Sequence, residues 1–98
     1  MYGLIGKIMA LPGQRELLIT ILLEGIAGMP GCLSYIVAKD QGDQDAIWVT
    51  EVWDNKESHT ESLTLPSVQK AIQQGRPLIA GFRERFETNP VGGYGLVE

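Results

Sequence analysis

Residues 46–53, with the sequence Ala-Ile-Trp-Val-Thr-Glu-Val-Trp, constrain the fold of this 98-residue chain more than any other segment. They are β-branched and aromatic almost throughout, a composition typical of a strand. Successive side chains of a strand point to opposite sides, so Glu51 and Trp53 share one face and Trp48 lies on the other. A strand with large rings on both sides must be covered on both sides, because an exposed apolar patch invites association.

The order of the predicted elements indicates what covers one of these faces. Strands are predicted at 2–10, 32–39, 46–53 and 83–88, a helix from Gln14 to Gly25 or Gly28, and helical pieces at 56–65 and 67–74. Residues 76–81 are expected to be irregular, and 89–98 to form a glycine-rich tail of the same single domain, 1–98. The order βαββαβ predicts a ferredoxin-like α+β fold, an antiparallel sheet with its helices on one face.

The other face of the sheet is expected to be covered by a second copy of the chain. A chain this short buries only about 60–65% of its unfolded surface, yet 44% of its residues are apolar. Two sheets pairing face to face would cover Trp48 and Val52 and enclose a barrel-like interior. Burying about 600 Å² of apolar area per subunit gives roughly 15 kcal/mol before the costs of association. We therefore expect a homodimer.

Charge and cysteine content exclude several classes of protein. The net charge is −4 and no basic stripe exists, so nucleic acid is not an expected partner. No apolar stretch approaches ~20 residues, so no membrane span is expected, and the first residues lack the pattern of a secretory signal. The single cysteine, Cys32, allows no intrachain disulfide and no thiolate zinc cluster. We expect a cytoplasmic protein without a metal site.

The second predicted strand is expected to alternate like the third. Leu33, Tyr35 and Val37 can share one face, which leaves Cys32 on the other with Ser34, Ile36 and Ala38. Cys32 is then interpreted as a small buried hydrophobe rather than a reactive thiol. In the first helix, apolar residues are expected to be buried on more than one side: Leu17, Leu18, Ile19, Ile21, Leu22 and Leu23.

Several short segments carry a resemblance to a known family. They are residues 28–33 (Gly-Met-Pro-Gly-Cys-Leu), 48–54 (Trp-Val-Thr-Glu-Val-Trp-Asp), 65–69 (Leu-Pro-Ser-Val-Gln) and 77–82 (Pro-Leu-Ile-Ala-Gly-Phe). From about Tyr2 to Thr88 the chain resembles the antibiotic biosynthesis monooxygenase family, which includes candidate quinol monooxygenases. The resemblance implies a dimeric α+β barrel. It also implies an oxidoreductase that oxidises a small aromatic or quinone-like molecule with O₂, with no flavin, haem or metal as cofactor.

The sequence departs from the family pattern at one position. Many relatives have a histidine near the position of Ser62, whereas the only histidine here is His59, about one helical turn earlier. A haem-degrading subgroup of the same fold has an asparagine in its first strand. None lies between Met1 and Ala10, so the resemblance does not extend to haem oxygenation.

Two residues are the candidates for proton transfer. His59 is the only side chain whose ordinary pKa lies near neutrality, which makes it the natural base, although a surface position near the helix start is an alternative. Glu51 lies in the middle of a strand, where a buried carboxylate must be paired, hydrogen-bonded or shifted in pKa. The structural alternative for Glu51 is a salt bridge to Arg76, Arg83 or Arg85, or to a partner subunit.

Five further residues are predicted to bind the substrate. Trp53 could form an aromatic wall, with core filling as the alternative, and Val49 shares its face. Arg76 could stabilise an enolate or phenolate oxygen, with a simple surface role as the alternative. Tyr35 and Phe82 are included because of their apolar neighbours in the sequence.

The resemblance favours a cofactor-independent monooxygenase acting on a quinol-type substrate. The alternative is a dimer without catalytic activity that binds a small hydrophobic molecule or serves in a stress response. An isomerase or lyase that uses proton transfer alone is a third hypothesis. All three require an apolar cavity with a few polar groups.

Overall fold

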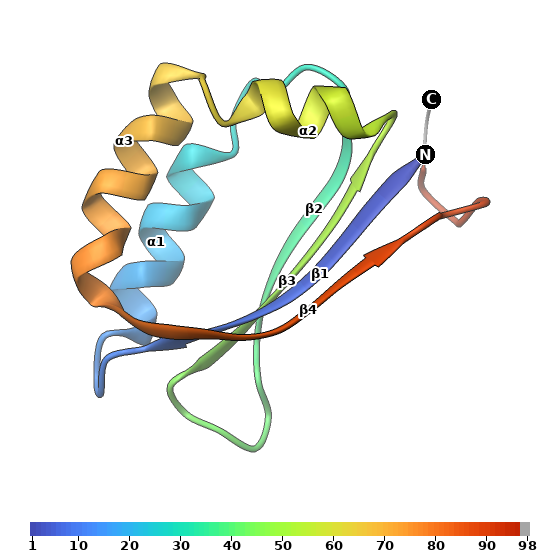
Figure 1. Cartoon of the computed structure of the whole chain (residues 1–98). Coiled ribbons are helices and arrows are strands. Elements are labelled where there is room, and N and C mark those ends of the chain that lie inside the picture. Colours follow the sequence, from blue (N-terminus) through green and yellow to red (C-terminus); the bar gives the residue numbers. More distant parts are fainter. Residues whose placement is uncertain (97–98) are drawn as a thin grey trace.

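The computed structural model describes residues 1–96, which form a four-stranded antiparallel sheet with its helices on one face (Figure 1). The strands are β1 (Tyr2–Ala10), β2 (Cys32–Lys39), β3 (Ala46–Trp53) and β4 (Ile79–Thr88). The helices are α1 (Arg15–Gly25), α2 (Lys56–Ser62) and α3 (Pro66–Gly75), followed by the 3₁₀ turn η1 (Arg76–Leu78). The predicted ferredoxin-like α+β fold is confirmed.

The sheet has the strand order β2-β3-β1-β4, so β3 and β1 lie in its centre. The register pairs Leu4 of β1 with Glu51 of β3, and Tyr35 of β2 with the same Glu51. Ile47, Val49 and Trp53 are buried on the face that the helices cover. The predicted alternation of β3 is therefore confirmed.

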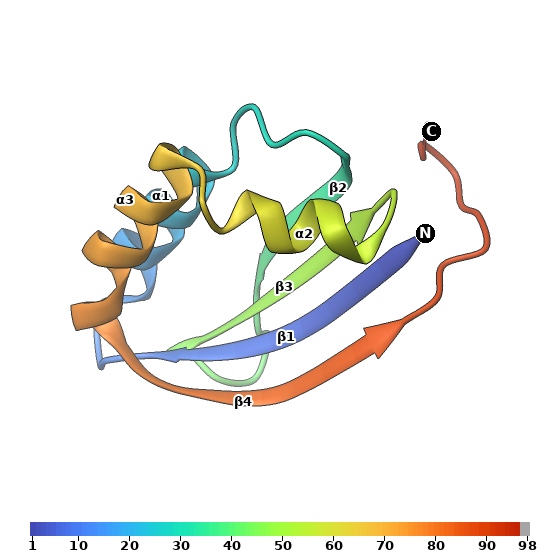
Figure 2. The same cartoon turned by 45° about the horizontal axis from the view of Figure 1, so that its top comes forward.

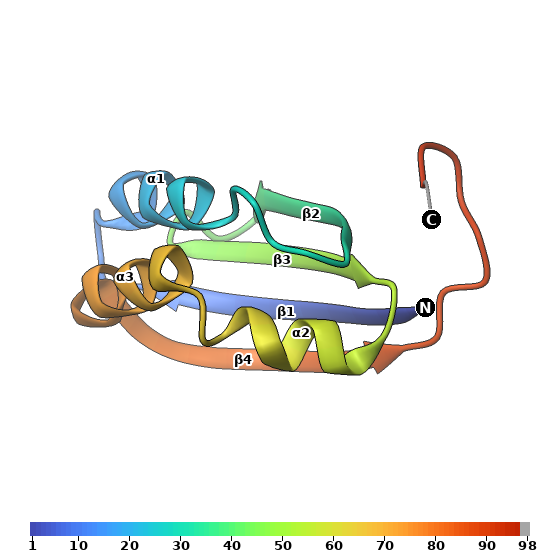
Figure 3. The same ribbon diagram turned by 90° about the horizontal axis from the view of Figure 1, so that it is seen from above.

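The helices divide the covered face between them. Figures 2 and 3 show α1 and α3 side by side over one end of the sheet, and Figure 3 shows α2 toward the other end, lying along β1 and β4. Asn55 caps α2, because its side-chain oxygen accepts a 2.8 Å hydrogen bond from the backbone N–H of Ser58. Pro66 occupies the first turn of α3, where its missing N–H costs nothing.

Two apolar clusters hold the helices on the sheet. One consists of Ala10, Leu18, Ile47 and Val49, under α1. The other consists of Tyr2, Leu4 and Trp53, with Met29 and Cys32 packed against it. The prediction that α1 is buried on more than one side was wrong, because Leu17 and Leu23 remain half exposed on its outer face.

Two strand predictions need correction. β4 begins at Ile79 rather than Arg83, since the irregular-looking residues 79–82 already pair with β1. A bulge between Cys32 and Ser34 shifts the register of β2, so Cys32 and Tyr35 face the same, helix-covered side. Cys32 is partly buried there, and burial raises the pKa of its thiol.

The rest of the chain adds no regular element. Residues 89–96 contain no helix or strand, as predicted for the glycine-rich tail, whose last two residues, 97–98, lie outside the described residues. Within residues 1–96, no helix is long and apolar enough to cross a bilayer.

Candidate functional site

A cavity of about 480 Å³ lies between the helix-covered face of the sheet and the helices. Its wall is apolar along α1 and α3, where the lining residues are Leu18, Leu22, Val68, Ala71 and Ile72. Polar side chains from β2, β3 and α2 line its other part: Tyr35, Glu51, Trp53, His59 and Ser62. The cavity therefore has an apolar wall and a polar end, as small-molecule sites commonly do.

Strand pairing and helix spacing bring the polar end together. Tyr35 and Glu51 face each other on paired strands, and Trp53 follows two residues later on the same face. His59 and Ser62 are three residues apart on α2, so both point toward the sheet. The hydroxyl of Ser62 donates a 2.6 Å hydrogen bond to the carbonyl oxygen of His59. Side chains from three separate elements, β2, β3 and α2, thus meet in this part of the cavity.

Glu51 is the buried carboxylate of this site. Its Oε1 accepts a hydrogen bond from Nε1 of Trp53 at 3.0 Å and lies 3.8 Å from Nε2 of His59. Burial raises the pKa of Glu51, against the smaller lowering effects of the Trp53 hydrogen bond and the charge of Arg85. Among residues 1–96, no arginine lies within 4.0 Å of this carboxylate, so the predicted arginine salt bridge is absent.

His59 is packed between aromatic rings rather than lying on the surface. Its ring centroid is 5.5 Å from that of Trp53, edge to face, and 5.8 Å from that of Tyr2. Its side chain is 17% exposed. Burial lowers the pKa of His59, and the positive charges of Arg85 and Lys56 lower it further, against the opposing effect of Glu87. The imidazole is therefore neutral at pH 7 and can accept a proton.

Four of the five predicted binding residues lie on the cavity wall, and the fifth, Val49, does not. Tyr35, Trp53, Arg76 and Phe82 line the cavity. Burial and the nearby Glu51 raise the pKa of Tyr35, so its phenol stays protonated. Val49 was predicted to bind substrate, but Leu18 of α1 covers it, and it packs in the core rather than on the wall.

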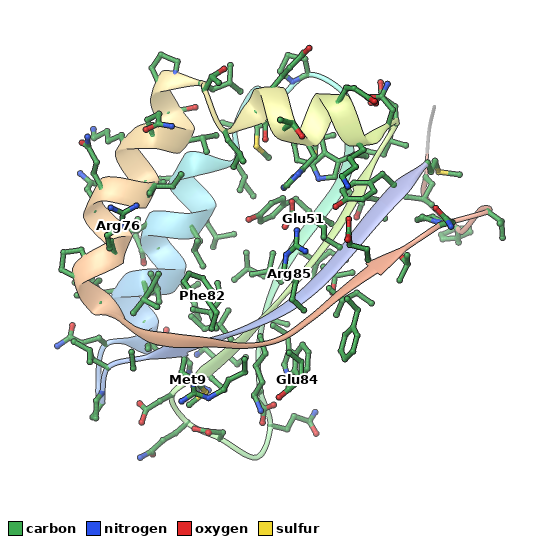
Figure 4. The ribbon with its side chains drawn as sticks, in the orientation of Figure 1. Met9, Glu51, Arg76, Phe82, Glu84 and Arg85 are labelled. Atoms are coloured by element: carbon green, nitrogen blue, oxygen red, sulfur yellow. The ribbon has the colours of Figure 1, made fainter. Side chains whose placement is uncertain are left out.

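A polar network ties α2 to β4 at the edge of the site. The hydroxyl of Tyr2 donates a 2.6 Å hydrogen bond to Oε2 of Glu87. Nζ of Lys56 lies 3.5 Å from the same oxygen and 5.8 Å from the centroid of the Tyr2 ring. Figure 4 shows Glu51, Phe82 and Arg85 on the helix side of the sheet, with Met9 and Glu84 on the opposite side.

Some lining residues were not predicted from the sequence. Ser62 could have been found from its spacing to His59, because residues three apart share a helix face. Met29 lies in the turn before β2 and lines the cavity, but nothing in its local sequence indicates this. In residues 1–96, no three side chains of His, Cys, Asp or Glu gather as metal ligands would.

The fold and this cavity define the class: a ferredoxin-like α+β domain with a cavity between sheet and helices. The antibiotic biosynthesis monooxygenase family model matches residues 1–74. The chain belongs to this family. No curated protein matches the sequence.

Solved structures agree with this assignment. A candidate antibiotic biosynthesis monooxygenase from Chloroflexus aurantiacus is 66% identical, with a TM-score of 0.96 over 98% of each chain. A candidate monooxygenase from Caulobacter crescentus is 17% identical, with a TM-score of 0.84 over 93% of this chain and 90% of that one. One from Nitrosomonas europaea is 10% identical, with a TM-score of 0.83 over 94% of this chain and all of the other. The last two show similarity of fold alone.

Proposed function

We propose that this protein is a cofactor-independent monooxygenase that oxidises a small aromatic, quinol-type molecule in the cavity, as a cytoplasmic homodimer. The observation that carries the proposal is the pair formed by Glu51 and His59. Its side chains lie 3.8 Å apart at the polar end of an apolar chamber. Family membership supports a monooxygenase. The choice of a quinol rests on the resemblance and on the shape and chemistry of this chamber.

The proposed reaction balances without an added reductant. A hydroquinone and O₂ give a hydroxyquinone and water, so the substrate supplies all the electrons that reduce O₂. The phenol first loses its proton, and the electron-rich ring carbon then forms a bond to O₂. Reprotonation of the distal oxygen gives a ring hydroperoxide. Loss of the ring hydrogen with cleavage of the O–O bond then releases water and leaves a new carbonyl.

His59 and Glu51 have distinct roles in this scheme. His59, neutral at pH 7, accepts the phenol proton and later returns it to the distal peroxide oxygen. Glu51 stabilises the imidazolium that forms between these steps, since its Oε1 lies near Nε2 of His59. The indole of Trp53, held by its hydrogen bond to Glu51, forms the wall on which the aromatic ring stacks. The apolar wall excludes water from the reduced oxygen.

The homodimer is proposed from the uncovered face of the sheet. Ile36 of β2 and Phe86 of β4 are 55% and 53% exposed on that face, and Trp48 lies on the same face of β3, two residues from the Thr50 that pairs with Ile36. A second copy that presents the same face would cover these side chains symmetrically. This arrangement corresponds to the dimeric α+β barrel that the resemblance implies.

Oxygen consumption with a panel of hydroquinones tests the catalytic proposal. The wild-type protein should incorporate one atom of isotope-labelled O₂ into the product and release the other as water. His59→Gln should lower kcat/KM by about 100-fold or more, while Thr60→Ala, on the exposed side of α2, should leave it unchanged. Quinols that bind in the cavity without consuming oxygen would instead favour the non-catalytic ligand-binding protein.

A further inference from the structure

Arg85 is a charged side chain beside the cavity that the predicted site did not include. It lies on β4 between Phe82, which lines the cavity, and Glu87, which accepts the hydrogen bond from Tyr2. Strand pairing places Arg85 opposite Gly6, which has no side chain to block it. Figure 4 shows Arg85 extending from β4 toward Glu51. Arg85 is not among the residues that line the cavity, and its side chain approaches Glu51 from the β4 side.

The charge of Arg85 is not neutralised by a close carboxylate. Among residues 1–96, no acidic side chain lies within 4.0 Å of it, whereas Glu87 pairs with Lys56 and Tyr2 instead. β4 is an edge strand, so Arg85 also remains accessible to a ligand that enters from this side. Its positive charge has a lowering effect on the pKa of one group from each of three other elements: Tyr2, Glu51 and His59.

From this placement we infer that Arg85 binds an anionic oxygen on the aromatic ligand, so that the cavity selects phenols and holds them as phenolates. The inference rests on the proposed function and specifies its substrate class. A guanidinium offers several N–H donors, and its bonds to charged oxygens are stronger than bonds to neutral ones. The carboxylate of Glu51 repels an anion, so the phenolate oxygen sits toward Arg85, with the ring against Trp53.

This assignment changes the role predicted for Arg76. Arg76 was expected to stabilise an enolate or phenolate, and it does line the cavity at the end of α3. Arg85, however, extends toward Glu51 (Figure 4), and its positive charge lowers the pKa of both Glu51 and His59, the proton-transfer pair. A phenolate formed by proton transfer to His59 is therefore stabilised by Arg85.

The ionisation of a bound chromogenic phenol tests the inference without relying on turnover. The probe is para-nitrophenol, whose phenolate absorbs visible light, titrated with pH while bound to the dimeric protein as purified. In the wild type, the bound probe should ionise at a lower pH than the free probe. Arg85→Gln should abolish this difference and weaken binding of the phenolate by about tenfold or more. Arg85→Lys should retain part of both effects.

Arg83→Gln is the matched control, because it removes the same charge from the same strand. Arg83 folds back over Gly81, which pairs with Met9 of the opposite face, so ionisation of the probe should be unaffected. Nitrobenzene, which cannot ionise, should bind the wild type and Arg85→Gln equally. If nitrobenzene binds but para-nitrophenol ionises as it does in water, the role of Arg85 is refuted and the aromatic cavity stands. If neither compound binds, the proposed function fails as well.

Discussion

Burial shifts the pKa values of Glu51 and His59 in opposite directions. Burial raises the pKa of the carboxyl and lowers that of the imidazole, because both prefer their neutral forms away from water. A carboxyl whose pKa is higher in the folded state than in the unfolded state lowers the free energy of unfolding as the pH rises from the unfolded-state pKa through the folded-state pKa. Glu51 is therefore a position at which stability is reduced and, in our proposal, chemistry is gained.

Replacing Glu51 by Gln should separate these two effects. Gln keeps an oxygen that accepts the hydrogen bond from Trp53 but carries no charge. The free energy of unfolding at pH 7, measured by urea denaturation, should therefore be higher than in the wild type, and the excess should disappear below about pH 4. Oxygenase turnover should fall by about 100-fold. A variant that is less stable than the wild type at pH 7 would show that the carboxylate stabilises the fold.

The pH dependence of turnover should reflect the low pKa of His59. Because burial, Arg85 and Lys56 favour the neutral imidazole, the acid limb of kcat/KM should lie below the ordinary histidine value of about 6.5. Arg85→Gln removes one of these positive charges and should move the limb to higher pH. An acid limb that does not move would indicate that another group titrates in the profile.

At the scale of elements, the closest helix contact is between α1 and α3. A Cβ added at Gly25 would lie 2.6 Å from the Cβ of Ala71. Replacing a helical glycine by alanine ordinarily stabilises a helix by about 1 kcal/mol. Here the opposite should hold, because the two helices must move apart.

Gly25→Ala should therefore lower the free energy of unfolding by about 1–3 kcal/mol. The double variant with Ala71→Gly restores the space and should recover most of the loss. Thermal or urea denaturation of the wild type, both single variants and the double variant measures this coupling. If the double variant is no more stable than Gly25→Ala alone, the contact between these helices is not the cause.

The strands differ in how well their bounds and register could be predicted from the sequence. β3 was predicted to the residue, because every position from Ala46 to Trp53 except Ala46 and Glu51 is β-branched or aromatic. The start of β4 was missed because residues 76–81, which contain Pro77 and Gly81, resemble a loop in sequence. Only pairing with β1 makes residues 79–82 a strand. The bulge that turns Cys32 toward the helices depends on the partner strand and has no local signal.

The site could be predicted only where alternation decides which way a side chain points. Glu51 and Trp53 line the cavity, on the face that the period of two along β3 assigns to them, and Tyr35, which was selected for its apolar neighbours, also lines it. Val49 has the same period but lies under α1, and sequence alone does not show which stretch of a strand a helix covers. Arg85 was considered only as a salt-bridge partner, since its approach to the cavity depends on the pairing of β4 with Gly6.

At the scale of the whole molecule, the two faces of the sheet differ in their cover. The helices bury one face, and the other presents half-exposed apolar side chains that a second copy can cover. Ile36→Glu should dissociate the proposed dimer, because two charges would enter the interface without partners. Ile36 is 55% exposed in the single chain, so the substitution should leave the subunit folded.

Light scattering measures the change, with a wild-type mass of twice the 10.7 kDa subunit and a mutant mass of one subunit. Leu23→Glu, at a residue 50% exposed on the outer side of α1, provides the control and should remain a dimer. A wild-type protein that scatters as a single subunit at micromolar concentration would contradict the homodimer. The cavity lies on the other face and is formed within a single subunit, so that result would not remove it.

β3 carries side chains for both faces on one backbone, with Glu51 toward the cavity between Thr50 and Val52 of the opposite side. A rotation of this strand that repositions Glu51 must also shift its neighbours. In the proposed homodimer, occupancy of the chamber and assembly of the subunits should therefore be thermodynamically coupled, and by linkage the coupling would be reciprocal. A compound that binds the assembled form more tightly should hold subunits together on dilution. By the same coupling, the apparent affinity of the protein for that compound should increase with protein concentration.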